Sequence, residues 1–396
     1  MSIILPVVAA FFILVVEWFD FAILLTVVDR LYRHIIQIPF HQDITSHEKS
    51  IIEAKSFREL CGLNGYTVEE HPVTTKDGFI LLLHRVLTKE GNMFNRPVVY
   101  LHHGFCMTSE VWVCLTEPSR CLAFVLVEKG YDVWLGNNRG NKYSGRSCHY
   151  SNAEAEFWDF SIDDFASKDI PESIAYILNI TGLEKLSYIG FSQGSAQAFA
   201  ALSVDQELKN RINLLIALAP AMSPAIATSS LHGLTTLSPA FAFRIFGRKS
   251  FFPPINIFQS TLHPFTFSRA MDAAILWLFG FRSANISVQQ KVAAYAHLYS
   301  STSVKVIVHW FQIMRHATFC RYDGRKFPTK SIETPIVLVY GDYDGLLDID
   351  AMLSELPAIN IVARRLSGYE HLDILWGNKV DVDVLPLVIE ALTEAA

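Results

Sequence analysis

Hydrophobic residues along most of the chain form short runs of the length of β-strands. Residues 66–75 and 79–86 are two strand-like runs on either side of a Lys-Asp-Gly turn, which predicts an antiparallel hairpin. Segments with helical spacing lie between further apolar runs. These further runs are almost continuously apolar, as expected of strands covered on both faces: residues 97–103, 131–136, 186–191, 213–220, 335–341 and 359–366. Strands that alternate with helices predict an α/β fold with a mostly parallel, doubly wound sheet.

The stretch between Pro220 and Thr334 interrupts this rhythm. It holds more than 100 residues without a convincing strand, and ten phenylalanines fall between Phe241 and Phe281. A structureless loop of this size is not expected inside a compact domain. We therefore predict an inserted, mostly helical cap. Burial in the core of the cap is the first explanation of the aromatic run, and an acyl-binding pocket or a lipid contact is the alternative.

The first 33 residues differ from the rest of the chain. From Ser2 to Val28 the only charges are Glu17 and Asp20, and basic residues follow only afterwards. A membrane-spanning helix needs about 20 apolar residues, and the two carboxylates would fall inside it. We predict a membrane anchor, either one tilted helix or a shallow hairpin; a buried amphipathic helix is the alternative. A cleaved signal peptide is not expected, because no basic segment precedes the apolar run.

The predicted organisation therefore has four parts in chain order. They are a membrane anchor over 1–33, a first part of the α/β core over 34–220, the helical cap over 221–331 and a second part of the core over 332–396. Basic residues on the carboxyl side of the anchor favour a cytosolic domain. Two glycosylation sequons, at Asn179 and Asn285, point the other way.

Composition narrows the classes of function. Hydrophobic residues make up 51% of the 396 positions and charged residues 18%, so much apolar surface must be buried or given to lipid. The net charge of −6 argues against a nucleic-acid partner. The six cysteines contain no C-x-x-C pair, and we expect mostly buried free thiols. No spacing typical of a metal site occurs, so no cofactor is expected.

One serine lies between two glycines where a predicted strand meets a predicted helix, in the sequence Gly190-Phe191-Ser192-Gln193-Gly194. An alkyl hydroxyl must be presented to a base and to a carbonyl together, and a sharp strand-to-helix turn does this. The glycines let the helix pass close to the strand. This context predicts that Ser192 is a nucleophile, with an ordinary loop serine as the alternative.

A hydrolase of this kind carries its acid and then its base later in the chain. His371 is the last of 14 histidines and the only one after the candidate acids, which makes it the candidate base. Four aspartates follow the strand that ends at Gly341, and those that are not the acid are explained as turn or helix caps: Asp342, Asp344, Asp348 and Asp350. The pattern alone leaves the choice among them open.

The oxyanion formed by such a serine needs two backbone N–H donors. Gln193, directly after the nucleophile, is expected to supply one, and the loop after the third strand of the sheet the other. That loop is His102-His103-Gly104-Phe105, and Phe105 is our choice. The adjacent histidines are expected to hold the loop by hydrogen bonds rather than to bind a metal.

Several longer motifs together resemble the acid lipase family of α/β hydrolases, which includes gastric and lysosomal lipases and fungal steryl ester hydrolases. The resemblance runs from about Phe57 to the carboxyl end, on the motifs GYTVEEHPVTTKDGFILLLHRV, VVYLHHGFCMTSEVWV, YDVWLGNNRGNKYS, FWDFSIDDFASKDIP, GFSQGS, GDYDGLLDID and YEHLDILWG. It implies an α/β-hydrolase fold with a lid-bearing cap and places the acid at Asp344 and the base at His371. It also supports Phe105 and Gln193 as oxyanion donors.

Two departures from the family pattern affect the interpretation. The common Leu-Gln-His-Gly is Leu101-His102-His103-Gly104 here, which concerns support of the loop rather than chemistry. The predicted anchor is unlike the secreted members and similar to the membrane-bound fungal enzymes.

The sequence thus predicts a serine hydrolase of neutral lipid esters at a lipid droplet or the endoplasmic reticulum membrane. The resemblance to the fungal branch makes steryl esters the first substrate class and triacylglycerols the second. A tethered esterase or thioesterase with soluble substrates, and an inactive lipid-binding or tethering protein, are the alternatives. The oligomeric state is left open.

Overall fold

The computed structural model describes residues 44–87, 95–222, 224–226, 228–251 and 262–395. Within these ranges, no helix is both long and apolar enough to cross a membrane. The anchor predicted over residues 1–33 lies outside the described residues.

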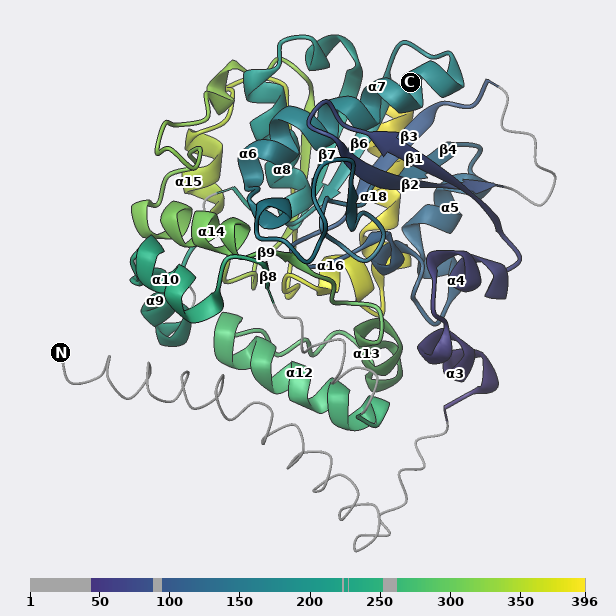
Figure 1. The fold of residues 1–396 in the computed structure, drawn as a ribbon. Helices are drawn as coiled ribbons and strands as arrows, with labels where there is room; N and C mark the ends of the chain where they lie inside the picture. The colour runs from purple at the N-terminus through teal and green to yellow at the C-terminus, as the bar shows by residue number, and fades with distance from the viewer. Residues whose placement is uncertain (1–43, 88–94, 223, 227, 252–261, 396) are drawn as a thin grey trace, which may run out of the picture.

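A nine-stranded sheet forms the centre of the molecule (Figure 1). Its main path runs β1-β2-β4-β3-β6-β7-β10-β11, and the short β5 (Arg146–Ser147) pairs with β2. The predicted hairpin is antiparallel, β2 is also antiparallel to β4, and all strands from β4 onward along the path are parallel. The bounds are β1 (Thr67–Thr74), β2 (Phe79–Leu87), β3 (Val98–His102), β4 (Asp132–Leu135), β6 (Leu186–Phe191), β7 (Ile212–Leu218), β10 (Ile336–Gly341) and β11 (Ile361–Leu366).

The central strands are buried on both faces because their side chains alternate between two hydrophobic clusters. In β10, Val337 and Val339 belong to one cluster, while Ile336 and Leu338 belong to the other. Successive residues of a strand point to opposite faces, so a strand that is covered on both sides must be apolar at almost every position. This explains the continuous apolar runs of the central strands. The prediction is wrong for β11, an edge strand whose four middle residues are exposed.

Helices cover both faces of the sheet (Figure 1). Residues of α8 pack into one cluster and residues of α5 and α18 into the other. The helices of the core are α3 (Ser46–Glu53), α4 (Phe57–Leu63), α5 (Leu122–Glu128), α6 (Ile162–Asp164), α7 (Ile170–Thr181), α8 (Gln193–Val204), α15 (Ile349–Ser354), α16 (Asp373–Trp376), α17 (Val380–Asp383) and α18 (Leu385–Glu394).

Most of the regular secondary structure in the described residues between β7 and β10 is helical. Four of their helices begin after a Ser or Thr whose side chain caps the first turn, which satisfies backbone N–H groups that the helix leaves free. Figure 1 shows α9, α10, α12 and α13 grouped at one end of the sheet. The helices are α9 (Ser229–Thr235), α10 (Pro239–Phe246), α12 (Pro264–Phe279), α13 (Val288–Tyr295) and α14 (Val304–His316).

This region also contains a short strand pair, which the sequence pattern did not predict. The two-residue strands β8 (Ser250–Phe251) and β9 (Thr302–Ser303) are antiparallel. A pair of this length has no detectable hydrophobic period, because alternation becomes visible only over about four residues or more.

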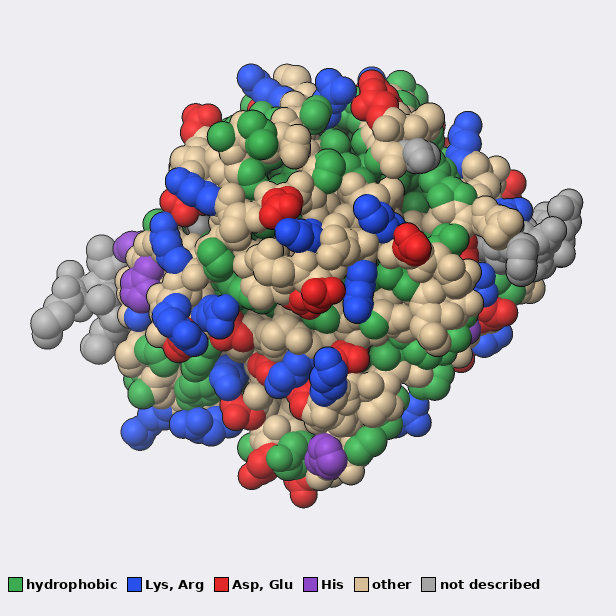
Figure 2. All heavy atoms as spheres, turned by 90° about the horizontal axis from the view of Figure 1, so that it is seen from above, with side chains coloured by type: hydrophobic (Ala, Val, Ile, Leu, Met, Phe, Trp, Pro, Cys, Tyr) green, Lys and Arg blue, Asp and Glu red, His purple; other side chains and the backbone are tan. Residues whose placement is uncertain are grey.

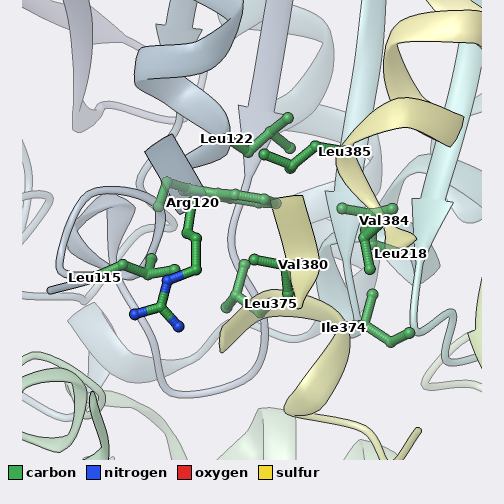
Figure 3. Close-up of a pocket in the computed structure, with 10 residues that line it drawn as sticks. Leu115, Arg120, Leu122, Leu218, Ile374, Leu375, Val380, Val384 and Leu385 are labelled. Atoms are coloured by element: carbon green, nitrogen blue, oxygen red, sulfur yellow. The ribbon is translucent and has the colours of Figure 1, made fainter. Parts of the chain in front are cut away.

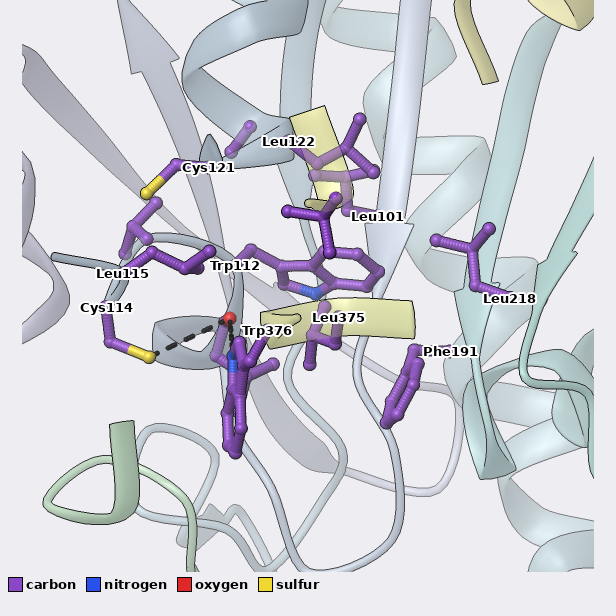
Figure 4. Close-up of a cluster of buried hydrophobic side chains, with 14 of the residues drawn as sticks. Leu101, Trp112, Cys114, Leu115, Cys121, Leu122, Phe191, Leu218, Leu375 and Trp376 are labelled. Carbon is purple, nitrogen blue, oxygen red and sulfur yellow. Dashed lines mark hydrogen bonds between the residues drawn. The ribbon is translucent and has the colours of Figure 1, made fainter. Parts of the chain in front are cut away.

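The cysteines of the chain are unpaired. All six cysteines are free and five are buried, in agreement with the prediction, while Cys148 is exposed. Figure 4 shows two hydrogen bonds in one cluster: the indole N–H of Trp376 donates to the carbonyl oxygen of Val111 at 3.0 Å, and the Cys114 thiol lies 3.8 Å from the same oxygen. Hydrogen-bonded indoles and thiols of this kind behave as ordinary core residues.

Figure 2 shows one face of the molecule. Basic and acidic side chains are interspersed across it, with hydrophobic side chains visible between them. Neighbouring charges of opposite sign keep the local field small on this face.

Candidate active site

Ser192 lies on a sharp turn between β6 and α8. Its backbone has φ of 51° and ψ of −118°, a strained conformation for a residue with a side chain. A Cβ at Gly190 would collide with the backbone of Ser195, and one at Gly194 would collide with the carbonyl of His102. Only glycine fits at both positions. The two glycines that flank Ser192 are therefore required by the close approach of the strand, the helix and the neighbouring loop at this turn.

The structure brings Ser192, His371 and Asp344 into one hydrogen-bonded chain. His371 Nε2 lies 2.8 Å from Ser192 Oγ, and His371 Nδ1 lies 2.7 Å from Asp344 Oδ2. A carboxylate accepts, so Nδ1 carries the proton and Nε2 is left to accept the proton of the serine hydroxyl. All three are buried, at 8%, 6% and 5% exposure. This geometry can activate a serine as a nucleophile.

The other aspartates that follow β10 have structural contacts. The carboxylate of Asp342 accepts from the Gly368 N–H at 2.6 Å and from Arg365 at 2.7 Å. Asp348 caps α15 by accepting from the Ala351 N–H at 2.9 Å. Asp350 lies in the first turn of the same helix.

The loop that carries Phe105 lies against the nucleophile. A Cβ at Gly104 would be 3.3 Å from the Cβ of Ser192, so the backbone of this loop passes directly beside the serine. Gln193 is the first residue of α8, and the N–H of a first residue has no partner within its helix. Both predicted oxyanion donors therefore lie on segments that border Ser192.

Of the two histidines predicted to hold this loop by hydrogen bonds, His102 leaves its buried Nδ1 without a partner among the described residues, and His103 supplies the bonds to the loop. Its Nε2 accepts from the Asn138 N–H at 3.1 Å, which leaves Nδ1 to donate to the Gly104 carbonyl at 2.8 Å. Burial lowers the pKa of His103 to about 4, and burial also lowers the pKa of His102 well below its usual value. Both imidazoles are therefore neutral near pH 7. Among the described residues, no cluster of three or more metal-ligating side chains occurs.

Cys106, next to Phe105, has a left-handed backbone with φ of 54°. Its carbonyl accepts from the Ser300 N–H at 2.6 Å, and the Ser300 hydroxyl accepts from the Lys142 N–H at 2.8 Å. A residue between α13 and α14 thus holds the strained end of the loop in place.

The loop that carries His371 is held by the segment after α12. The Phe281 ring stacks on the His371 imidazole, with centroids 5.6 Å apart and planes 4° apart. The Glu370 carboxylate accepts from the backbone N–H groups of Arg282 and Ser283, at 2.9 Å and 2.5 Å. Asn285 adds a hydrogen bond from Nδ2 to the Gly368 carbonyl at 2.7 Å.

A small buried cavity occurs elsewhere in the core (Figure 3). It has a volume of about 10 Å³ and is lined mainly by leucine and valine side chains, with Arg120 at one side. None of the five candidate site residues lines it. Its volume is about that of one water molecule, so it is too small for an acyl chain.

Comparisons with known proteins agree with this geometry. A model of the α/β hydrolase fold matches residues 97–377, and a model of a partial α/β-hydrolase lipase region matches residues 57–116. The first covers well over half of the chain. The chain belongs to the lipase family of α/β hydrolases.

Relatives of this lipase-family protein support the assignment. A probable lipase of Schizosaccharomyces pombe is 47% identical over 367 residues, which cover 87% of this chain and 78% of the relative. Human gastric triacylglycerol lipase is 32% identical over a region that covers 83% of this chain and 89% of the relative. Rat lysosomal acid lipase/cholesteryl ester hydrolase is also 32% identical, over a region that covers 78% of this chain and 84% of the relative. Membership of this family makes the protein a lipase-type ester hydrolase.

A solved structure of a candidate lipase from Sulfolobus solfataricus shares the fold. It superimposes with a TM-score of 0.60 at 17% identity and covers 84% of this chain and 95% of its own. At this identity the likeness concerns the fold alone.

Some residues that border the site of this lipase-family protein were not singled out from the sequence. Phe281 and Glu370 lie at the loop that carries His371, called the histidine loop below, and Ser300 lies at the loop that carries Phe105. Trp310 donates its indole N–H to Gln193 Oε1 at 2.6 Å. The phenylalanine-rich run drew attention to the region of Phe281 but not to that ring. No signal in the sequence identifies the other three, because each acts through a contact with a segment distant in the chain.

Proposed function

We propose that the chain cleaves carboxylic esters of neutral lipids through an acyl-enzyme on Ser192. The observation that carries the proposal is the continuous hydrogen-bonded chain from Ser192 Oγ through His371 to Asp344. An acid, a base and a serine on a strained turn, in this chain order and at these distances, are the requirements of serine ester hydrolysis.

In the first half of the reaction, Ser192 Oγ attacks the ester carbonyl and its proton passes to His371 Nε2. Asp344 holds the imidazole by its Nδ1–H and stabilises the charged imidazolium. The backbone N–H groups of Phe105 and Gln193 donate to the oxyanion of the tetrahedral intermediate. When the intermediate collapses, the C–O bond to the alcohol breaks and His371 returns its proton to the leaving oxygen.

In the second half, water replaces the alcohol. His371 takes a proton from the water as it attacks the acyl carbonyl, and the same two N–H groups stabilise the new oxyanion. Collapse releases the carboxylic acid and returns the proton to Ser192 Oγ. The chain supplies each of these groups, so the proposed reaction uses no cofactor.

Steryl esters are the proposed substrates, with triacylglycerols as the second candidate. The support for steryl esters is the resemblance to the fungal steryl ester hydrolases and the similarity to a rat protein named cholesteryl ester hydrolase. The support for triacylglycerols is the similarity to human gastric triacylglycerol lipase.

We also propose where the reaction takes place. The substrates are insoluble, and the apolar residues 1–33 suit an anchor at a lipid droplet or membrane surface. The helices α9, α10, α12 and α13 group at one end of the sheet, which suits a cap over a site in which Ser192 is only 8% exposed. A cap that excludes water strengthens the interactions that stabilise the oxyanion.

The test compares cholesteryl oleate and trioleoylglycerol emulsions as substrates of the purified full chain and of Ser192→Ala. We expect the substitution to lower kcat by about 10³-fold or more on either ester that is cleaved, because it removes the nucleophile. The matched control is Ser203→Ala, on the same helix and buried to 2% exposure, which should keep the wild-type rate.

Three outcomes would change the proposal. Faster cleavage of trioleoylglycerol than of cholesteryl oleate would reverse the substrate order. A short-chain ester cleaved without any rise in rate at its solubility limit would favour an esterase with soluble substrates. A wild-type chain that neither hydrolyses esters nor is labelled at Ser192 by a fluorophosphonate, which loses fluoride when serine attacks phosphorus, would leave only a lipid-binding role.

A further inference from the structure

One hydrogen bond connects the inserted region to the residue that follows the nucleophile. The indole N–H of Trp310, on α14, donates to the side-chain oxygen of Gln193 at 2.6 Å. Trp310 is 6% exposed and Gln193 is 1% exposed, so water does not compete for this bond. We propose that Trp310 is a positioning residue that orients the Gln193 backbone N–H toward the oxyanion. This inference rests on the proposed ester hydrolysis.

The Gln193 backbone needs an outside restraint. The peptide between Ser192 and Gln193 follows a residue with a strained φ of 51°, and its N–H belongs to the first residue of α8, so no helical hydrogen bond orients it. A small rotation of this peptide would turn the N–H away from the oxyanion. A fixed Gln193 side chain opposes that rotation, because the side chain and the N–H share the same Cα.

The donor side of the bond is itself fixed. Val306, Trp310 and Ile313 belong to the same hydrophobic cluster as Ala196 and Phe199 of α8. Beside Trp310, His309 donates from Nε2 to the Cys320 carbonyl at 2.8 Å. The helix α14 is therefore part of the packed core, and the indole holds Gln193 from a rigid element.

The other proposed oxyanion donor is held from the same region of the chain. The Ser300 N–H donates to the carbonyl of Cys106, the residue after Phe105, as described above. Residues 300 and 310 thus restrain the two segments that carry the oxyanion donors. Rigid support of donors that must not reorient during the reaction is the main requirement of an oxyanion hole.

The test replaces Trp310 with Phe, which keeps an aromatic ring in the core and removes only the indole N–H. Misplacing one donor is expected to lower kcat about 10-fold, less than the loss of a donor, while KM stays within about 2-fold. The affinity of a trifluoromethyl ketone inhibitor measures how strongly the enzyme stabilises an oxyanion. Ser192 Oγ adds to the ketone carbon, the serine proton passes to His371, and the ketone oxygen becomes an anion. The affinity of this inhibitor should be about 10-fold lower for Trp310→Phe than for the wild type, the same factor as in kcat.

Trp158→Phe is the matched control. Trp158 is also 6% exposed, belongs to the same cluster as Trp310, and donates its indole N–H to the Asn152 carbonyl at 2.7 Å. Both substitutions remove a buried indole hydrogen bond, so both should lower Tm to a similar extent. Only Trp310→Phe should lower kcat and inhibitor affinity, which separates positioning from a purely structural role.

The inference is overturned if Trp310→Phe keeps the kcat and inhibitor affinity of Trp158→Phe while the wild type is active. If Trp310→Phe does not fold, Gln193→Met removes the acceptor and leaves the indole in place. Wild-type kcat and inhibitor affinity in that variant overturn the inference equally. A wild-type chain without esterase activity overturns the proposed function, and this inference with it, since no oxyanion then forms.

Discussion

At the scale of single residues, Asp344 differs from the aspartates around it in what its carboxylate contacts. The carboxylate of Asp342 accepts from the Gly368 N–H, and that of Asp348 caps α15. Asp344 Oδ2, in contrast, lies 2.7 Å from His371 Nδ1. We expect Asp344→Asn to lower kcat by about 10³-fold or more, because an amide neither selects the imidazole tautomer that accepts from Ser192 nor stabilises the imidazolium. Steady-state hydrolysis of the preferred ester measures the effect.

Asp348→Asn is the control for this substitution. Asn caps a helix about as well as Asp, so its stability and kcat should match the wild type. If the two variants lost activity to the same extent, the assignment of Asp344 as the acid would be wrong.

At the scale of elements, the histidine loop depends on the segment after α12. Glu370 accepts two backbone N–H groups of that segment, and Phe281 of the same segment stacks on His371. We expect Glu370→Ala to lower the free energy of unfolding by about 1–2 kcal/mol, since hydrogen bonds to a charged acceptor are lost at a partly exposed site. We also expect a lower kcat with little change in KM, because His371 is less firmly placed.

Two variants make this prediction specific. Glu370→Gln keeps one acceptor oxygen and should restore part of both losses. Glu333→Ala removes a carboxylate that is paired with Lys209 at the surface, where such pairs contribute little, and should leave kcat unchanged. Equal kcat values for Glu370→Ala and Glu333→Ala would exclude a positioning role for Glu370.

At the scale of the whole molecule, buried neutral histidines make stability depend on pH. Burial lowers the pKa of His84 to about 3 and that of His309 to about 4. The unfolded chain protonates the same side chains near a pKa of about 6.5. Between these values the unfolded state binds more protons, so the free energy of unfolding falls as the pH falls from about 6.5 toward 4.

His84→Asn tests this dependence by denaturant unfolding between pH 5 and pH 6. Removing one such histidine should make the slope of the free energy of unfolding against pH shallower by up to about 1.4 kcal/mol per pH unit. Phe57 stacks on His84 with centroids 4.3 Å apart, so Phe57→Leu loosens the same site without removing a proton-binding group. That variant should keep the wild-type slope, and a wild-type slope in His84→Asn would contradict the prediction.

Much of the architecture is determined locally and could be predicted from the sequence. The continuous apolar runs correctly predicted central strands covered on both faces, because alternate side chains enter two separate clusters, whereas the edge strand β11 is exposed. The glycines around Ser192 predicted a close approach that the structure contains. Chain order and family resemblance selected Ser192, Asp344 and His371, and the structure joins them by hydrogen bonds of 2.7 Å and 2.8 Å. The anchor over residues 1–33 stays a prediction.

Only the tertiary structure decided which distant side chains meet. Hydrophobic period specifies which face of an element is buried but not which neighbour covers it. For this reason the sequence could not place β4 between β2 and β3, Trp310 against Gln193 across 117 positions, or Phe281 on His371. The sequence by itself determined the candidate reacting groups, because side-chain chemistry and chain order can be read directly from it, while the choice of Asp344 among four aspartates came from the family resemblance. The supports that hold those groups were decided by packing between elements.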